Sequence, residues 1–264
     1  MSKIKSVFDS LDKKQSKALI PFITAGDPNP EMTIEILHTL VDAGADMIEL
    51  GIPFTDPMAD GPVIQRASER AIANNVGIKK TIEIVKEFRQ KNKHTPIILM
   101  GYANPMEAIG IDLFIQLIHE AHVDGVITVD YPPEEAKSFV EKLKAKNIDT
   151  IFLLSPTTED KRIKLIIEQA TGFIYYVSLK GVTGSANIDI DQVTERVRNI
   201  KRYTKLPIGV GFGVRDAKTA KEVALISDAV VIGSRIVQEI ENSSRADLIS
   251  NIKKLMTEMK QAIA

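Results

Sequence analysis

The sequence contains no cysteine, no marked excess of charge of either sign and no long apolar run. Without cysteine, the chain cannot build disulfide bonds, thiolate zinc sites or a cysteine nucleophile. Its 34 basic and 35 acidic side chains give a formal net charge of −1, which argues against a dedicated binder of nucleic acid or anionic membranes. No stretch approaches the ~18 consecutive apolar residues of a membrane span, and the first residues lack the apolar core of a signal peptide. We therefore expect a soluble, cytoplasmic protein.

Eight short apolar segments alternate with longer stretches of helical periodicity along the 264 residues. They are nearly continuous in apolar residues, which is typical of parallel strands covered on both faces. The segments are Ala18–Thr24, Asp46–Leu50, Pro96–Met100, Gly125–Val129, Thr150–Leu154, Phe173–Val177, Pro207–Val210 and Asp228–Ile232. Because no linker or change of composition interrupts the alternation, it predicts one α/β domain over residues 1–264, a (β/α)₈ barrel. The spacing of Ile4, Val7, Phe8 and Leu11 predicts an extra N-terminal helix on the core.

A doubly wound open sheet is the alternative fold. Such a sheet usually opens with a glycine-rich dinucleotide-binding turn, and the first segment here ends in Ala25–Pro28 without one. Pro21 interrupts the first segment, since proline cannot donate to a strand ladder. We interpret it as a local irregularity, because the other seven segments are unaffected, and we favour the barrel.

The second segment carries a carboxylate where a barrel would place its active site, at the carboxyl end of a strand. Side chains alternate along a strand, so Met47 and Glu49 share one face while Ile48 and Leu50 share the other. If Ile48 and Leu50 pack under helices, Glu49 points into the barrel mouth, where burial would raise its pKa into the range of a usable acid or base. The structural alternative is a glutamate held by a hydroxyl or cation of a neighbouring strand.

Two more acids follow in an irregular connection, residues 51–62, which is rich in proline and glycine. Asp60 precedes Gly61-Pro62 and a helical pattern, so it is also a candidate for a helix-capping residue. The spacing alone does not choose between Asp56 and Asp60 as a functional acid. Near the sixth segment, one of the adjacent Tyr175 and Tyr176 must face the barrel interior.

Glycine-containing turns end the last three segments, at Gly181–Gly184, Gly211–Val214 and Gly233–Arg235. Glycine lets backbone N–H groups approach an anion closely, and barrels commonly bind phosphate after the seventh and eighth strands. The three turns together predict a substrate that carries phosphate. No metal site is predicted, because His119 and His122 lack a third ligand and precede a strand, on the face that serves stability.

Several of these motifs together resemble the tryptophan synthase alpha chain family. The motifs are Pro21–Pro28, Glu49–Phe54 with Asp56-Pro57 and Ala59–Pro62, Gly101–Pro105, Gly181–Gly184, Gly211–Val214 and Ile232–Ser234. They run from the first segment to the eighth, so the resemblance covers essentially the whole chain.

The resemblance implies a lyase of tryptophan biosynthesis that splits indole-3-glycerol phosphate into indole and glyceraldehyde 3-phosphate without a cofactor or metal. Glu49 would be the acid and base, Asp60 would accept the indole N–H, and Tyr175 matches an active-site tyrosine. Thr183 would reach over the substrate toward Asp60. Other implied contacts are Phe22, Met100, Tyr102 and Phe212 around the indole, and Gly184, Gly213, Gly233 and Ser234 at the phosphate.

The resemblance also implies a partner, the tryptophan synthase beta chain, in a complex of two alpha and two beta chains that passes indole through a channel. Residues 53–60 and 130–133 would face it. One position departs from the pattern: some members carry arginine where this chain has Leu179, which puts a charge contact of the closing loop in doubt.

Two other functions stay open from the residues alone. A Schiff-base aldolase could use Lys180, near the end of the sixth segment. A catalytically silent subunit that only activates a partner is the other, and the presence of both Glu49 and Asp60 argues against it.

Overall fold

The computed structural model describes residues 2–178, 189–211 and 213–264, and in them eight parallel strands close into a barrel. Each strand pairs with the next in sequence, and β1 pairs with β8. The strands are β1 (Ala18–Thr24), β2 (Ile48–Gly51), β3 (Ile97–Gly101), β4 (Gly125–Thr128), β5 (Asp149–Leu154), β6 (Ile174–Val177), β7 (Ile208–Gly211) and β8 (Ala229–Ile232). The closed order confirms the (β/α)₈ barrel and excludes the open sheet.

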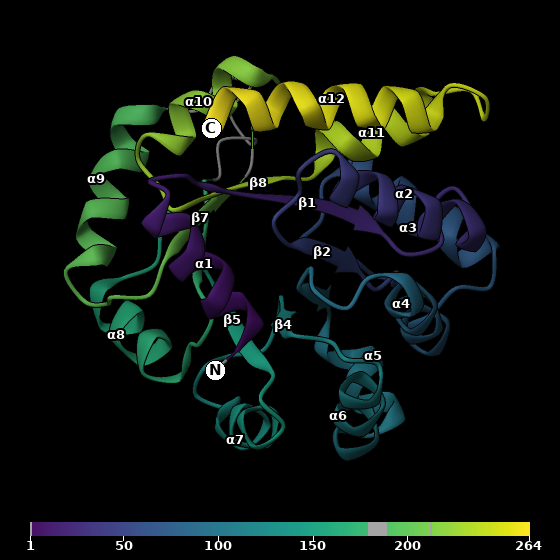
Figure 1. Ribbon diagram of the computed structural model, residues 1–264. Coiled ribbons are helices and arrows are strands. Elements are labelled where there is room, and N and C mark those ends of the chain that lie inside the picture. Colours follow the sequence, from purple (N-terminus) through teal and green to yellow (C-terminus); the bar gives the residue numbers. More distant parts are fainter. Residues whose placement is uncertain (1, 179–188, 212) are drawn as a thin grey trace.

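Helices form a ring around the strands, and α1 lies across one end of the barrel (Figure 1). The helices are α1 (Lys3–Lys13), α2 (Pro30–Asp42), α3 (Pro62–Ala73), α4 (Ile78–Lys91), α5 (Ala103–Ile109), α6 (Ile111–Glu120), α7 (Lys137–Ala145), α8 (Asp160–Gln169), α9 (Ile190–Lys201), α10 (Ala217–Ala224), α11 (Ser234–Asn242) and α12 (Leu248–Ile263). The extra N-terminal helix is confirmed. The segments after β2, β3 and β8 each hold two helices instead of one, and the pairs after β3 and β8 were not predicted.

Side chains alternate between the barrel interior and the layer under the helices, as a strand requires. Met47 and Tyr175 pack in the interior cluster, whereas Ile48, Leu50 and Tyr176 pack in the outer cluster with the helices. This confirms the alternation expected for the second strand, and it settles that Tyr175 is the inward-facing tyrosine.

Pro21 lies where β1 changes partner. Residues 18–21 of β1 pair with β8, ending at the pair Pro21 and Ile232, and from Phe22 onward β1 pairs with β2. The residue without an N–H therefore falls at the boundary between two ladders, where a missing donor interrupts neither.

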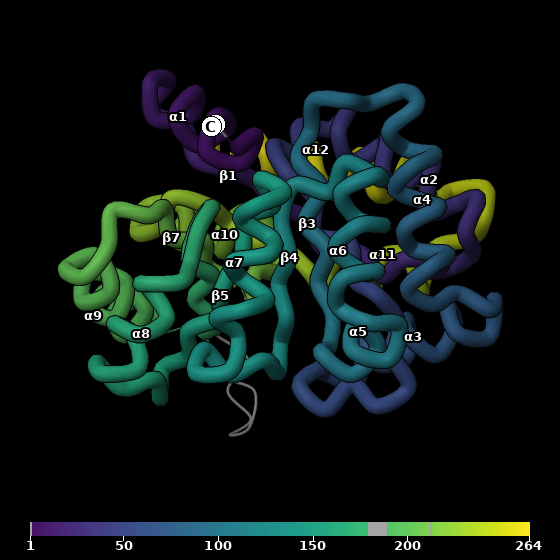
Figure 2. The backbone as a smooth tube through the Cα atoms, turned by 90° about the horizontal axis from the view of Figure 1, so that it is seen from below, coloured from purple at the N-terminus to yellow at the C-terminus, as the bar shows by residue number. Residues whose placement is uncertain are grey.

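The α1 helix closes the barrel at the amino ends of its strands. Ile4, Phe8 and Leu11 are buried against the interior cluster, and the rings of Phe8 and Phe173 lie 5.8 Å apart. Figure 2 shows α1 at one end of the molecule and α3 and α5 at the other. Within the described residues, no helix combines the length and apolar character needed to span a membrane. One end of the barrel interior is thus covered by α1, and the opposite end is left for a site.

We expect Ile4→Ala to destabilise the fold by about 2–5 kcal/mol, because it removes a fully buried side chain that seals the barrel end. Urea unfolding measures the change in free energy. Val7→Ala, on the same helix but only half-buried, is the matched control and should lose clearly less. Equal losses in the two variants would show that α1 is not packed as described.

Candidate active site

A cavity of about 110 Å³ opens at the carboxyl ends of the strands and brings together most of the predicted site residues. Those lining it are Phe22, Glu49, Asp60, Met100, Tyr175, Gly213, Gly233 and Ser234. Tyr102 lines a smaller adjoining cavity of about 20 Å³, together with Phe22, Asp60 and Met100. Thr183, Gly184 and Phe212 lie outside the described residues, as do Leu179 and Lys180.

The Glu49 carboxyl is the most strongly desolvated acid at this cavity. Glu49 is fully buried, and among the described residues neither of its carboxylate oxygens has a hydrogen-bond partner. Because burial penalises the charged form, the pKa of Glu49 is raised to about 8. The alternative of a glutamate held by a neighbouring hydroxyl or cation is not what the described residues show. Glu49 is therefore neutral at pH 7 and can donate a proton.

Asp60 faces the same cavity in a more polar environment. Burial raises its pKa to about 6, while a hydrogen bond from the Tyr102 hydroxyl opposes that rise. The same hydroxyl accepts the N–H of Ala59 at 3.1 Å, so Tyr102 ties the carboxylate to its own loop. At pH 7 Asp60 is mainly ionised. The two carboxyl groups thus stand in opposite protonation states on one cavity.

Tyr175 stands beside Glu49 in the barrel interior. Burial raises the pKa of its hydroxyl well above the ordinary value, and the Glu49 carboxylate adds to that rise. Gly211 on the neighbouring strand leaves room for the ring, since a Cβ there would overlap the Tyr175 hydroxyl. Tyr175 therefore remains a neutral hydroxyl at the cavity wall.

Another part of the cavity wall has the features of an anion site. Gly233 caps α11 without a side-chain hydrogen bond, and Gly213 has a positive φ of 81° that favours glycine. The start of α11 thus points its backbone N–H groups and the positive end of its dipole at the cavity. Ser234, the first residue of the helix, adds a hydroxyl to the same wall.

Sequence reasoning missed several lining residues, namely Gly61, Ile64, Val214 and Val231. Val231 could have been found from the alternation in β8, because it shares a face with Ala229 in the interior cluster. Ile64 had no comparable signal, since its place depends on where α3 lies over the barrel.

A larger hollow of about 770 Å³ lies at the other end, between α1 and the amino ends of the strands. Its size alone does not make it the active site. Lysine and aspartate side chains around it, such as Lys201 and Asp228, pair with each other at 3.0 Å. The amino ends of barrel strands serve stability, whereas catalytic groups come from the carboxyl ends. We therefore place the site at the smaller cavity.

The chain is a (β/α)₈ barrel in which a neutral carboxyl group, an ionised carboxyl group and a helix start line one cavity. These features define an acid–base enzyme for an anionic substrate. Similarity to known protein families narrows this class of enzyme. The sequence profile of the family described as tryptophan synthase alpha chain matches residues 8–264. The chain belongs to this family.

Individual relatives agree with this assignment along the full chain. The tryptophan synthase alpha chain of Janthinobacterium sp. (strain Marseille) is 55% identical over 263 residues, covering 100% of this chain and 99% of that one. The crystal structure of tryptophan synthase subunit alpha from Legionella pneumophila str. Paris has a TM-score of 0.93 at 42% identity, covering 100% and 98%. The aminoacrylate-bound tryptophan synthase from M. tuberculosis has a TM-score of 0.90 at 29% identity, covering 100% of both chains.

We expect Glu49 to make the stability of the protein depend on pH. A carboxyl group whose pKa rises from 4.5 to about 8 on folding binds more protons when folded, so stability falls as pH rises through this range. Relative to Glu49→Gln, the wild type should lose up to about 1.4 kcal/mol per pH unit between these values. Urea unfolding at a series of pH values measures the difference.

The matched control for this measurement is Glu87→Gln, at an exposed glutamate on α4. A difference between wild type and Glu49→Gln that stays constant from pH 4.5 to pH 8 would contradict the buried, neutral state of Glu49.

Proposed function

We propose that this chain cleaves indole-3-glycerol phosphate by a retro-aldol reaction, with Glu49 as acid and base and Asp60 as electrostatic stabiliser. The products are indole and glyceraldehyde 3-phosphate. The observation that carries the proposal is the pair of carboxyl groups on one cavity, with pKa values of about 8 for Glu49 and about 6 for Asp60. Family membership supports the same lyase activity.

The reaction needs a proton donor first and a proton acceptor second. The bond between indole C3 and the side chain breaks only when C3 is protonated, which turns the ring into an electron sink. Neutral Glu49 can supply this proton and becomes a carboxylate. That carboxylate then takes the proton of the side-chain hydroxyl as the carbon–carbon bond breaks, so one group serves both steps and returns to its starting state.

Asp60 has a different task, because protonation at C3 leaves positive charge on the indole ring. An ionised carboxylate that accepts the indole N–H stabilises this charge as it develops. The Tyr102 hydroxyl holds Asp60 in place, and Phe22, Ile64 and Met100 supply apolar walls for the ring. The phosphate group would lie at Gly213, Gly233 and Ser234, which line the same cavity.

We propose the beta chain of tryptophan synthase as the partner, in a complex of two alpha and two beta chains that acts in the cytoplasm. An alpha chain implies a beta chain by its family, and the loop 53–60 offers a surface for it. Met58 in this loop is 77% exposed, and Phe54 beside it contacts the Tyr102 ring at 5.4 Å. A partner that covers Met58 would therefore contact the loop that carries Asp60.

Glu49→Gln should fold normally and lose cleavage by at least about 10²-fold, because glutamine has similar volume but cannot transfer a proton. The release of indole from indole-3-glycerol phosphate measures this, with and without beta chain. Near-normal turnover would remove Glu49 from its role.

The rate should be highest between about pH 6 and pH 8, because cleavage needs Asp60 ionised and Glu49 protonated. The rate should fall below about pH 6 as Asp60 gains a proton, and above about pH 8 as Glu49 loses one.

Asp60→Asn should cripple cleavage in the isolated chain. Asp56→Asn, in the same loop, should mainly weaken the response to beta chain, and the reverse pattern would reverse the two assignments.

A further inference from the structure

Two of the helices, α3 and α11, begin at the proposed active site. The α3 helix follows directly on Asp60 and Gly61, and α11 begins at Ser234 after Gly233. In the proposed reaction, the indole end of the substrate lies at the start of α3 and the phosphate end lies at the start of α11. The distance between these two helices therefore determines whether one substrate can reach both ends.

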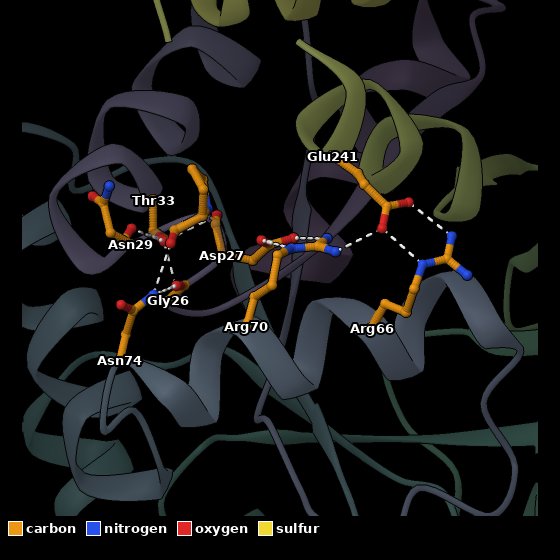
Figure 3. Close-up of polar contacts among 9 residues, drawn as sticks. Gly26, Asp27, Asn29, Thr33, Arg66, Arg70, Asn74 and Glu241 are labelled. Carbon is orange, nitrogen blue, oxygen red and sulfur yellow. Dashed lines mark hydrogen bonds and ion pairs between the residues drawn. The ribbon is translucent and has the colours of Figure 1, made fainter. Parts of the chain in front are cut away.

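Arg70 of α3 joins these two helices and the loop after β1. Its Nε and Nη2 donate to the two carboxylate oxygens of Asp27 at 2.7 and 2.9 Å, and its Nη1 donates to Glu241 of α11 at 2.8 Å. Figure 3 shows the Arg70 guanidinium between the two carboxylates, with Arg66 on the far side of Glu241. Arg66 completes the array with two bonds of 2.7 Å to Glu241.

The Asp27 end of this array is fixed on several sides. The Asp27 side chain is fully buried, so its charge depends on the fork of the Arg70 guanidinium. Asn74, at the end of α3, donates to the carbonyl of Pro28 at 2.7 Å, which ties the same helix to the same loop a second time. The α3 helix is therefore anchored on the barrel through the loop after β1.

An apolar contact lies beneath the ion pairs. Phe22 of β1, Ala67 of α3 and Val237 of α11 form one small buried cluster, and Val63, Ile64 and Met100 pack against it. Phe22, Ile64 and Met100 also line the cavity. A shift of α3 against α11 would therefore change the walls of the site as well as its length.

We propose that Arg70 is a positioning residue that sets the spacing between Asp60 and the phosphate-binding start of α11, and so the length of substrate that the site accepts. The inference rests on the proposed function. Arginine suits this task because its planar guanidinium holds two carboxylates in fixed directions, which the single ammonium of lysine cannot do. Arg70 does not line the cavity, so it acts through the two helices.

The test compares ligands that touch one helix with a ligand that bridges both. The probes are glycerol 3-phosphate, indole, and an indole joined by a three-carbon chain to a phosphate, which lacks the hydroxyl groups needed for cleavage. Binding to wild type, Arg70→Lys and Glu241→Gln is measured by calorimetry, and kcat and KM are measured for cleavage. Glu241→Gln keeps Asp27 paired with Arg70, so it serves if Arg70→Lys folds poorly.

We expect both variants to bind the two short ligands as the wild type does, and to bind the bridging ligand about 10-fold more weakly or worse. A misplacement of about 1 Å can reduce a rate about 10²-fold, so kcat should fall by up to that factor. Arg162→Lys, at an exposed ion pair between α8 and Glu134 in the turn before α7, is the matched control and should leave all values unchanged.

Affinities for all three ligands that fall together, or that stay unchanged, would overturn the positioning role. Failure of the wild type itself to bind the bridging ligand would instead contradict the proposed function. The two failures are therefore distinguishable.

Discussion

The chemistry proposed for this protein depends on one constraint, the closure of a parallel sheet into a barrel whose side chains alternate between two apolar layers. A closed barrel has no third place for a side chain, so Glu49 must share the interior with Met47 and Tyr175. The resulting desolvation is what keeps its carboxyl group protonated near neutral pH. The inward position of Glu49 in β2 is therefore enough to raise its pKa, without a specific partner side chain.

The remaining features can be understood as ways to preserve that environment. At the amino ends of the strands, α1 packs Ile4 and Phe8 against the interior layer and so shields these interior side chains from water. At the carboxyl ends, α3 and α11 cover part of the mouth and meet over Phe22. Asp60 comes from the loop before α3 and not from the barrel interior, which leaves its pKa lower than that of Glu49. Two carboxyl groups of similar intrinsic acidity therefore differ because of where the chain places them.

Much of this arrangement could be predicted from the sequence, because it depends on local patterns. Apolar segments and their punctuation locate all eight strands to within two residues, and period-two alternation assigns Glu49 to the interior. The same alternation requires one of Tyr175 and Tyr176 to face inward, and the structure shows that it is Tyr175. The paired helices after β3 and β8 were not predicted, since in each pair the two helices pack against each other within one connection. The pairing of Arg70 with Glu241 could not be predicted, because it joins residues 171 positions apart and only the folded barrel brings them together.

The position of α1 has a consequence for the order in which a newly synthesised chain can fold. Its apolar face, with Ile4 and Phe8, emerges from the ribosome well before several of the residues that cover it. Ile4 fits against Gly125 and Gly172, and Phe8 against Phe173. This face therefore remains incompletely covered until Phe173 has been translated, and β1 can pair with β8 only later still. A growing chain must carry an unfinished barrel with an exposed apolar helix, which is the kind of surface that chaperones bind.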